Sequence, residues 1–134
     1  MHSVEEKQQY LSEPHVGVLA VGRKDRAPVA MPIWYDYRPG GTVRVWTPRS
    51  SAKAHLIAAA GNFSFVVQDV QPPYKFVRAE GPVVSMTDAT NDIVREIASR
   101  YVSDEEVSQY IEVNEQGGYV IIEMLPERFI GWAE

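Results

Sequence analysis

The sequence predicts a mainly β protein, in which six or seven antiparallel strands close into a small barrel with three or four short helices around it. Apolar segments of strand length follow one another with tight turns between them, as in an antiparallel sheet. The helical segments do not alternate regularly with the strands, which argues against a doubly wound parallel sheet. Neither G-x-G-x-x-G nor G-K-[ST] occurs, so the sequence contains no Rossmann or P-loop fingerprint.

Composition narrows the class of protein further. At 134 residues the chain fits one domain, expected over residues 1–134, and its net charge of -5 argues against a general nucleic-acid binder. There is no cysteine, and the three histidines lack metal-ligand spacing, so no metal site is expected. No leader or long apolar run is evident, so we expect no membrane span and a cytoplasmic location.

The first third of the chain predicts a helix and two strands. Ser3-x-x-Glu6 has the form of a capping box and opens a short helix, which Glu13-Pro14 ends. Residues 16–21 are apolar and rich in β-branched residues, and a polar turn separates them from a second strand over residues 28–37. Pro32 cannot donate a ladder hydrogen bond, so this second strand should be an edge strand, or bulged or bent there.

The stretch from residue 42 to residue 56 carries the first functional hypothesis. A tight turn at Pro39-Gly40-Gly41 leads into a strand over residues 42–47, and Ser50 or Ser51 then caps a short helix reaching Ala60. Arg49 and Lys53 flank the helix start, where the positive end of the helix dipole disfavours cations. Two cations there indicate a bound anion such as phosphate. Two solvated cations beside an ordinary N-cap are the alternative.

The remaining elements follow from similar signals. Alternating apolar residues predict a strand over residues 63–68, and a long strand over residues 74–86 is interrupted by Gly81-Pro82. Two helices should follow, the first capped by Asp88 or Thr90 and reaching Tyr101, the second opening at Ser103. The chain ends with an apolar strand over residues 119–125 and a final segment over residues 128–132.

Four short motifs follow one another in the first two-thirds of the chain: Val16-Gly17-Val18-Leu19-Ala20, Ala27-Pro28-Val29-Ala30-Met31-Pro32-Ile33-Trp34-Tyr35, Trp46-Thr47 with Ser51-x-Lys53-x-x-Leu56, and Tyr74-x-Phe76-Val77-Arg78-Ala79-Glu80-Gly81. In this order they resemble the split β-barrel flavin and deazaflavin oxidoreductases, the pyridoxamine-5'-phosphate-oxidase-like family. The resemblance implies a split barrel in a homodimer, with two cofactor sites at the subunit interface and either FMN or coenzyme F420 as the cofactor.

The resemblance also implies which residues bind that cofactor. Its phosphate would lie at the start of the short helix, and its ring along the second strand. Gln68 and Trp132 would come from the neighbouring subunit. The cofactor-binding residues expected are Met31, Pro32, Ile33, Trp34, Thr47, Arg49, Ser50, Ser51, Lys53, Gln68 and Trp132. The sequence Lys53-Ala54-His55-Leu56 lacks a second cation that many relatives carry, and the chain lacks the Arg-rich C-terminal extension of genuine pyridoxamine-phosphate oxidases.

Function follows from the same resemblance. An oxidoreductase would use reduced deazaflavin or FMN for hydride transfer to a small conjugated or aromatic substrate, and the cofactor would carry the chemistry. We therefore assign no catalytic acid or base. The alternatives are a carrier or sensor that binds flavin without turnover, and a barrel with no cofactor at all.

Overall fold

The computed structural model describes residues 3–132, which form a seven-stranded antiparallel sheet and four short helices. In the sheet the strand order is β2-β1-β4-β5-β6-β3, and β7 pairs with β5. The strands are β1 (Gly17–Arg23), β2 (Arg26–Ile33), β3 (Val43–Pro48), β4 (Asn62–Gln68), β5 (Phe76–Asp88), β6 (Tyr119–Met124) and β7 (Arg128–Gly131). The helices are α1 (Val4–Ser12), α2 (Ala52–Ala60), α3 (Asn91–Ala98) and α4 (Asp104–Glu115). The predicted mainly β class is confirmed.

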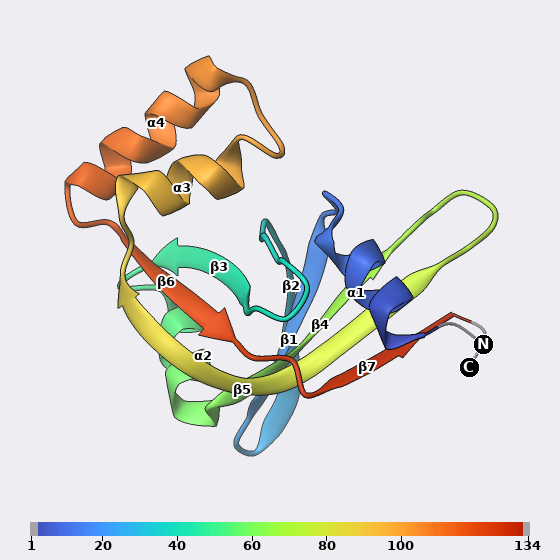
Figure 1. Cartoon of the computed structure of the whole chain (residues 1–134). Helices are drawn as coiled ribbons and strands as arrows, with labels where there is room; N and C mark the ends of the chain where they lie inside the picture. Colours follow the sequence, from blue (N-terminus) through green and yellow to red (C-terminus); the bar gives the residue numbers. More distant parts are fainter. Residues whose placement is uncertain (1–2, 133–134) are drawn as a thin grey trace.

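The sheet curls into a half-barrel rather than a closed ring (Figure 1). β5 bends through both halves: Phe76–Pro82 pair with β4, and Val83–Asp88 run along β6. The sequence predicted an interruption at Gly81-Pro82; β5 passes from β4 to β6 after Pro82, and its register shifts between Val83 and Ser85. At Gly81 the backbone carbonyl oxygen of Leu125 lies 2.0 Å from the position that a Cβ would take. β2 and β3 are the two ends of the strand order, so the barrel is split between them. Pro32 therefore lies on an edge strand, which confirms that prediction.

The helix starts follow the capping signals in the sequence. Ser3 and Glu6 form a complete capping box, and Ser51, not Ser50, caps α2. Thr90, not Asp88, caps α3, and Ser103 caps α4. The residues that cap are those whose side-chain oxygen reaches the N–H three positions on.

Two predicted boundaries were wrong by three or more residues. The second strand ends at Ile33 rather than Tyr37, because the chain leaves the ladder there and pairs again only at an isolated bridge between Asp36 and Arg44. The helix predicted to reach Tyr101 ends at Ala98. Arg100 and Tyr101 form tertiary contacts instead of a further helical turn.

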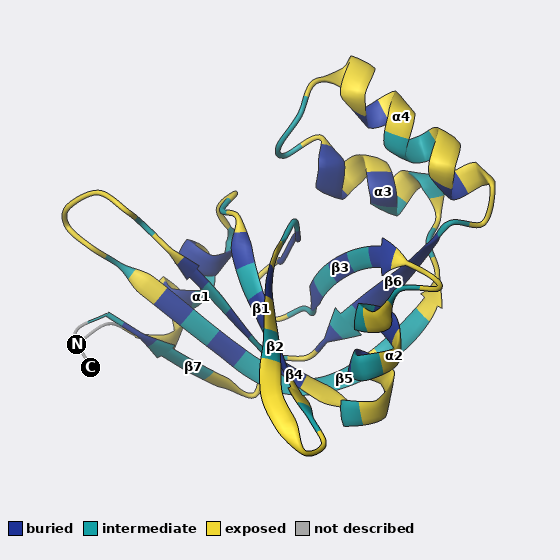
Figure 2. Ribbon diagram, turned by 180° about the vertical axis from the view of Figure 1, so that it is seen from behind, coloured by how far each residue is buried: buried dark blue, intermediate teal, exposed yellow. Residues whose placement is uncertain are grey.

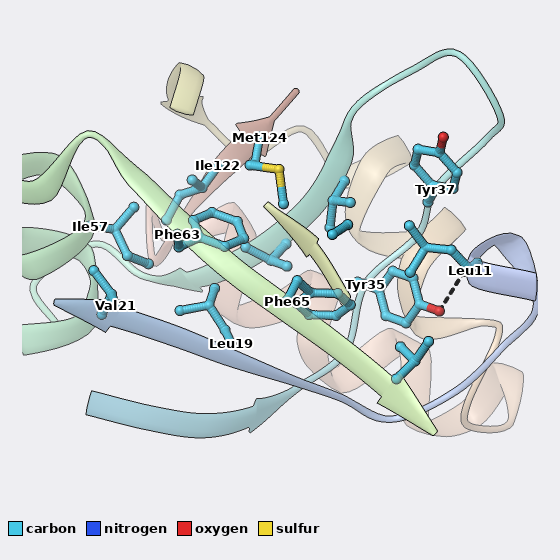
Figure 3. Packing of buried hydrophobic residues seen from close by; sticks show 14 of the residues in the cluster. Leu11, Leu19, Val21, Tyr35, Tyr37, Ile57, Phe63, Phe65, Ile122 and Met124 are labelled. Carbon is cyan, nitrogen blue, oxygen red and sulfur yellow. Dashed lines mark hydrogen bonds between the residues drawn. The ribbon is translucent and has the colours of Figure 1, made fainter. Parts of the chain in front are cut away.

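The core fills the inside of the half-barrel. Buried positions alternate with half-buried ones along β1, β3 and β4, as expected for strands with one face inward (Figure 2). Figure 3 shows Tyr35 and Phe65 at the centre of this cluster, with ring centroids 4.6 Å apart. The Tyr35 hydroxyl donates to the carbonyl of Leu11 at 2.6 Å, which ties the end of α1 to the barrel. Within residues 3–132, no helix has the length and apolarity needed to cross a lipid bilayer.

Candidate functional site

A pocket of about 520 Å³ opens where β2 and β3, the end strands of the sheet, meet α2 and α4. This volume lies within the range of roughly 300–1,000 Å³ that is typical of small-molecule sites. Its lining is mostly apolar and aromatic with a few polar groups: Val16, Pro32, Ile33, Trp34, Trp46, Thr47, Pro48, Lys53, Tyr110 and Tyr119. The pocket therefore lies beside the split of the barrel.

The polar corner of the pocket is built by the start of α2. The Ser51 hydroxyl accepts from the N–H of Ala54 at 3.1 Å, and its oxygen lies 3.1 Å from that of the buried Thr47 hydroxyl. Lys53 follows two residues later and lines the pocket. Because the first N–H groups of a helix have no partner within it, this corner combines hydroxyls, free N–H groups and an ammonium. That donor set suits a phosphate or another anion.

The other walls are aromatic. The centroid of the Trp34 indole lies 6.0 Å from that of Trp46 and 5.3 Å from that of Tyr110, both edge-on. Trp46 also contacts Tyr119, with centroids 5.7 Å apart. Burial raises the pKa of Tyr119 above its ordinary value. Such walls suit a flat conjugated ring system.

The pocket brings together five of the eleven residues that the sequence predicted for cofactor binding. Pro32, Ile33 and Trp34 come from β2 and the segment after it, and Thr47 and Lys53 come from β3 and α2. Ser51 lies behind the polar corner, in contact with Thr47. Met31 does not reach the pocket, because it alternates to the buried side of β2 and belongs to the core cluster.

Arg49 and Ser50 lie in the exposed turn between β3 and α2, outside this lining. The Arg49 guanidinium pairs with the Asp88 carboxylate at 2.7 Å and donates to the carbonyl of Gly117 at 3.1 Å. Of the two cations at the helix start, Lys53 is therefore the one that lines the pocket.

Gln68 and Trp132 lie at the opposite end of the barrel. There Trp132 contacts Tyr10 edge-on, with centroids 5.2 Å apart, and the Lys75 ammonium lies 5.3 Å from the Trp132 ring. Figures 1 and 2 both show β7 and the β4–β5 loop at the end of the barrel away from α4. Within one chain these two residues do not join the pocket, so any role there has to come from a second subunit.

Sequence reasoning missed Tyr110 and Tyr119 as pocket residues. The helical spacing of Val107, Tyr110 and Ile111 predicted an apolar face of a helix, and Tyr119 stood in an apolar strand. Neither pattern predicts which residues, distant in the sequence, the Tyr110 and Tyr119 side chains contact. The packing of α4 brings Tyr110 to Trp46, and the pairing of β3 with β6 brings Tyr119 there.

Solved structures share this architecture. An F420 reductase superposes with a TM-score of 0.75 over 92% of this chain and 94% of its own, at 23% identity. The fold is the split β-barrel of flavin and deazaflavin proteins. An FAD-binding protein from Mesorhizobium loti (TM-score 0.66, 18% identity, 97% and 94% covered) and the heme storage protein HutZ from Vibrio cholerae (TM-score 0.66, 12% identity, 95% and 90% covered) share it too.

These similarities confirm the resemblance seen in the four motifs at the level of the fold. No protein-family model and no curated protein matches the chain. This one fold occurs in a reductase, an FAD-binding protein and a heme storage protein, so the fold alone does not identify the ligand or the reaction. The residues that line the pocket carry that information. Its donor set fits a phosphate-bearing planar cofactor: hydroxyls and an ammonium lie at one end, and indole and phenol rings line the rest.

Proposed function

We propose that this protein binds a flavin-type cofactor, coenzyme F420 or FMN, in the pocket beside the split, and uses it for hydride transfer to a small conjugated or aromatic substrate. One observation carries the proposal: Lys53 and Thr47 line the same pocket as Pro32, Ile33 and Trp34, in a fold shared with an F420 reductase. A phosphate site and a ring site within one pocket are what such a cofactor requires.

In this proposal the start of α2 binds the phosphate. The Lys53 ammonium supplies a charge-assisted contact, the Thr47 hydroxyl a further hydrogen bond, and the helix N-terminus a favourable dipole. Ser51 holds the first turn in place, because its hydroxyl caps the N–H of Ala54. Arg49 and Ser50 lie next to this corner, and Arg49 adds to its positive potential at most from a distance, since it is paired with Asp88.

The ring lies along the end of β2. As the edge strand of the sheet, β2 has backbone groups that no neighbouring strand pairs, and these can hydrogen-bond to polar atoms of a ring. Pro32 and Ile33 give an apolar surface beneath the ring, and Trp34 gives an aromatic one. Together these residues orient the ring and exclude water from one of its faces.

When bound, such a cofactor supplies the hydride or electron pair itself. The lining of the pocket, taken over residues 3–132, contains neither histidine nor a carboxylate. The chain's part is therefore to bind, orient and shield. This lining also suits a carrier or sensor without turnover, and the fold is shared with a heme storage protein, so turnover has to be tested separately from binding.

We further propose a homodimer whose second subunit completes each site with Gln68 and Trp132. Trp132 contacts Tyr10 of α1, Gln68 pairs with Phe76, and neither lines the pocket of its own chain, so a second copy is the route by which they reach a cofactor. In this proposal the chain acts as a single domain over residues 1–134, in the cytoplasm and without nucleic acid.

Paired titrations test the proposal. F420, FMN and phosphate-free riboflavin are added to the purified protein, and binding is followed by the change in their fluorescence. We expect micromolar or tighter binding of F420 or FMN, and weaker binding of riboflavin than of FMN. No binding of any of the three would overturn the proposal. Turnover of the reduced cofactor with quinones and unsaturated ketones then separates an enzyme from a carrier.

A further inference from the structure

We infer that Tyr110 of α4 is a ring-binding residue of this pocket, and that the α3–α4 hairpin serves to hold it there. The inference rests on the proposed function and extends it. It states that a helix outside the barrel, and not only the strands, supplies a residue that contacts the planar ring of the cofactor. Neither the sequence motifs nor the resemblance pointed to this residue.

The contacts of Tyr110 carry the argument. Its ring lies 5.3 Å from Trp34 and 5.9 Å from Trp46, at interplanar angles of 68° and 61°. Trp34 and Trp46 are themselves steeply inclined, at 78°. Three aromatic rings at steep angles make a corner in which a flat ring can stack on one of them and meet the edges of the others.

These three rings are not part of the barrel core. The core cluster contains Tyr35, Phe65 and their neighbours, while Trp34, Trp46 and Tyr110 lie outside it and are only half-buried. They line the pocket instead. Large aromatic area left partly exposed in a concave site is available to a ligand.

The hairpin that carries Tyr110 is fixed at both ends. At one end, the Asn114 side-chain amide donates to the carbonyl of Ala89 and to the side-chain oxygen of Asn91, both at 2.9 Å. At the other end, Arg100 donates to the carbonyl of Ser12, and the Tyr101 hydroxyl donates to the carbonyl of His15 at 2.6 Å. Figure 1 shows α3 and α4 as a pair, which the chain enters from β5 and leaves into β6 at the same end.

Because both ends are fixed, Tyr110 is a preorganised wall. A ligand that packs against it does not have to order the helix first, so contact with the ring is not offset by that entropic cost. Tyr110 contacts the planar ring of the ligand and not its phosphate. Its removal should therefore weaken riboflavin binding as much as FMN binding, whereas removal of Lys53 should weaken FMN binding alone.

Four variants test the inference: Tyr110→Ala, Tyr110→Leu, Tyr110→Phe and the control Gln109→Ala, an exposed neighbour on the same helix. Dissociation constants are measured for F420, FMN and riboflavin, and folding is checked by urea unfolding. We expect Tyr110→Ala and Tyr110→Leu to weaken every one of these ligands that the wild-type protein binds, by the same factor of roughly ten. Tyr110→Phe and Gln109→Ala should retain wild-type affinity.

Tyr110→Leu keeps apolar bulk without a flat ring, so it tests the contact even if Tyr110→Ala unfolds. Unchanged affinities in a folded Tyr110→Leu protein overturn the inference while the proposed function stands. A loss that affects FMN but leaves riboflavin unchanged also overturns it, because the effect would then act on the phosphate. If the wild-type protein binds none of the three ligands, the proposed function fails and the inference fails with it.

Discussion

The ring of Tyr101 stacks on the indole of Trp34, with centroids 5.2 Å apart and planes inclined by 5°. Trp34 is thereby covered on one face by the turn after α3, while it lines the pocket. The Tyr101 hydroxyl also donates to the carbonyl of His15 and lies 3.4 Å from the backbone N–H of Tyr35. One residue thus joins the hairpin, the end of β2 and the segment after α1.

Truncating Tyr101 to alanine should lower the free energy of unfolding more than removing its hydroxyl does. Tyr101→Phe loses the hydrogen bond to His15 and should lower the free energy of unfolding by about 1 kcal/mol. Tyr101→Ala also loses the stack and should cost about 2–4 kcal/mol. Urea unfolding measures both, and the tryptophan emission should shift only in Tyr101→Ala. Equal losses in the two variants would show that the stack contributes nothing.

Lys53→Ala should weaken binding of FMN or F420 roughly ten- to a hundredfold, as the loss of a charge-assisted phosphate contact requires. The free energy of unfolding should change by less than about 0.5 kcal/mol, and affinity for riboflavin should not change. Titration of the ligands with wild-type and variant protein measures the difference. An equal loss for riboflavin would contradict a phosphate role.

Arg49→Ala is the matched cation control. The Arg49–Asp88 pair is exposed, so its loss should change stability by less than about 1 kcal/mol. Since Arg49 does not line the pocket, its removal should weaken FMN or F420 binding less than about fivefold. A loss as large as that of Lys53→Ala would place Arg49 at the phosphate after all, as the sequence suggested.

Gly81→Ala should destabilise the bend of β5. A Cβ at residue 81 would lie 2.0 Å from the carbonyl oxygen of Leu125, and backbone cannot move aside as a side chain can. We expect a loss of about 1–3 kcal/mol or more, read from urea unfolding. Gly22→Ala is the control, because a Cβ there meets nothing within 4 Å. It should be neutral or stabilising by up to about 1 kcal/mol; similar losses in both variants would contradict the steric explanation.

Stability should fall at alkaline pH through Tyr35. Burial, and next the neighbouring Tyr101, raise the pKa of Tyr35 above its ordinary value near 10. The folded state therefore keeps a proton that the unfolded chain releases above about pH 10, so the stabilisation is complete below that pH and declines above it. The slope is at most about 1.4 kcal/mol per pH unit for this group.

Tyr35→Phe removes the titrating hydroxyl, so the free energy of unfolding of the variant should not decline through this group above pH 10. The stability advantage of the wild-type protein over the variant should therefore shrink as the pH rises from 9 to 11. Urea unfolding at several pH values measures it. A difference that stays constant over this range would show that Tyr35 titrates alike in the folded and unfolded states.

Local patterns predicted a large part of the pocket. The family resemblance implied Pro32, Ile33 and Thr47, and the position of Lys53 at the start of the short helix pointed to it independently. Each signal lies within a few residues of the side chain it concerns, which is why it could be interpreted without coordinates. Arg49 carried the same local signal as Lys53, but Asp88 and Gly117, both far along the chain, engage it.

By itself the sequence determined most of the strands and where the helices start, because capping, alternation and turn chemistry act between near neighbours. It also led to the hypothesis, which the titrations above test, that the start of α2 binds an anion. The resemblance to the split-barrel family implied the split, which the strand order confirms. Tertiary structure alone decided that α4 brings Tyr110 to the two tryptophans. The physical reason is that the docking of a helix depends on contacts between distant residues, such as Arg100 with Ser12 and Tyr101 with His15, and no periodicity in the chain encodes such pairs.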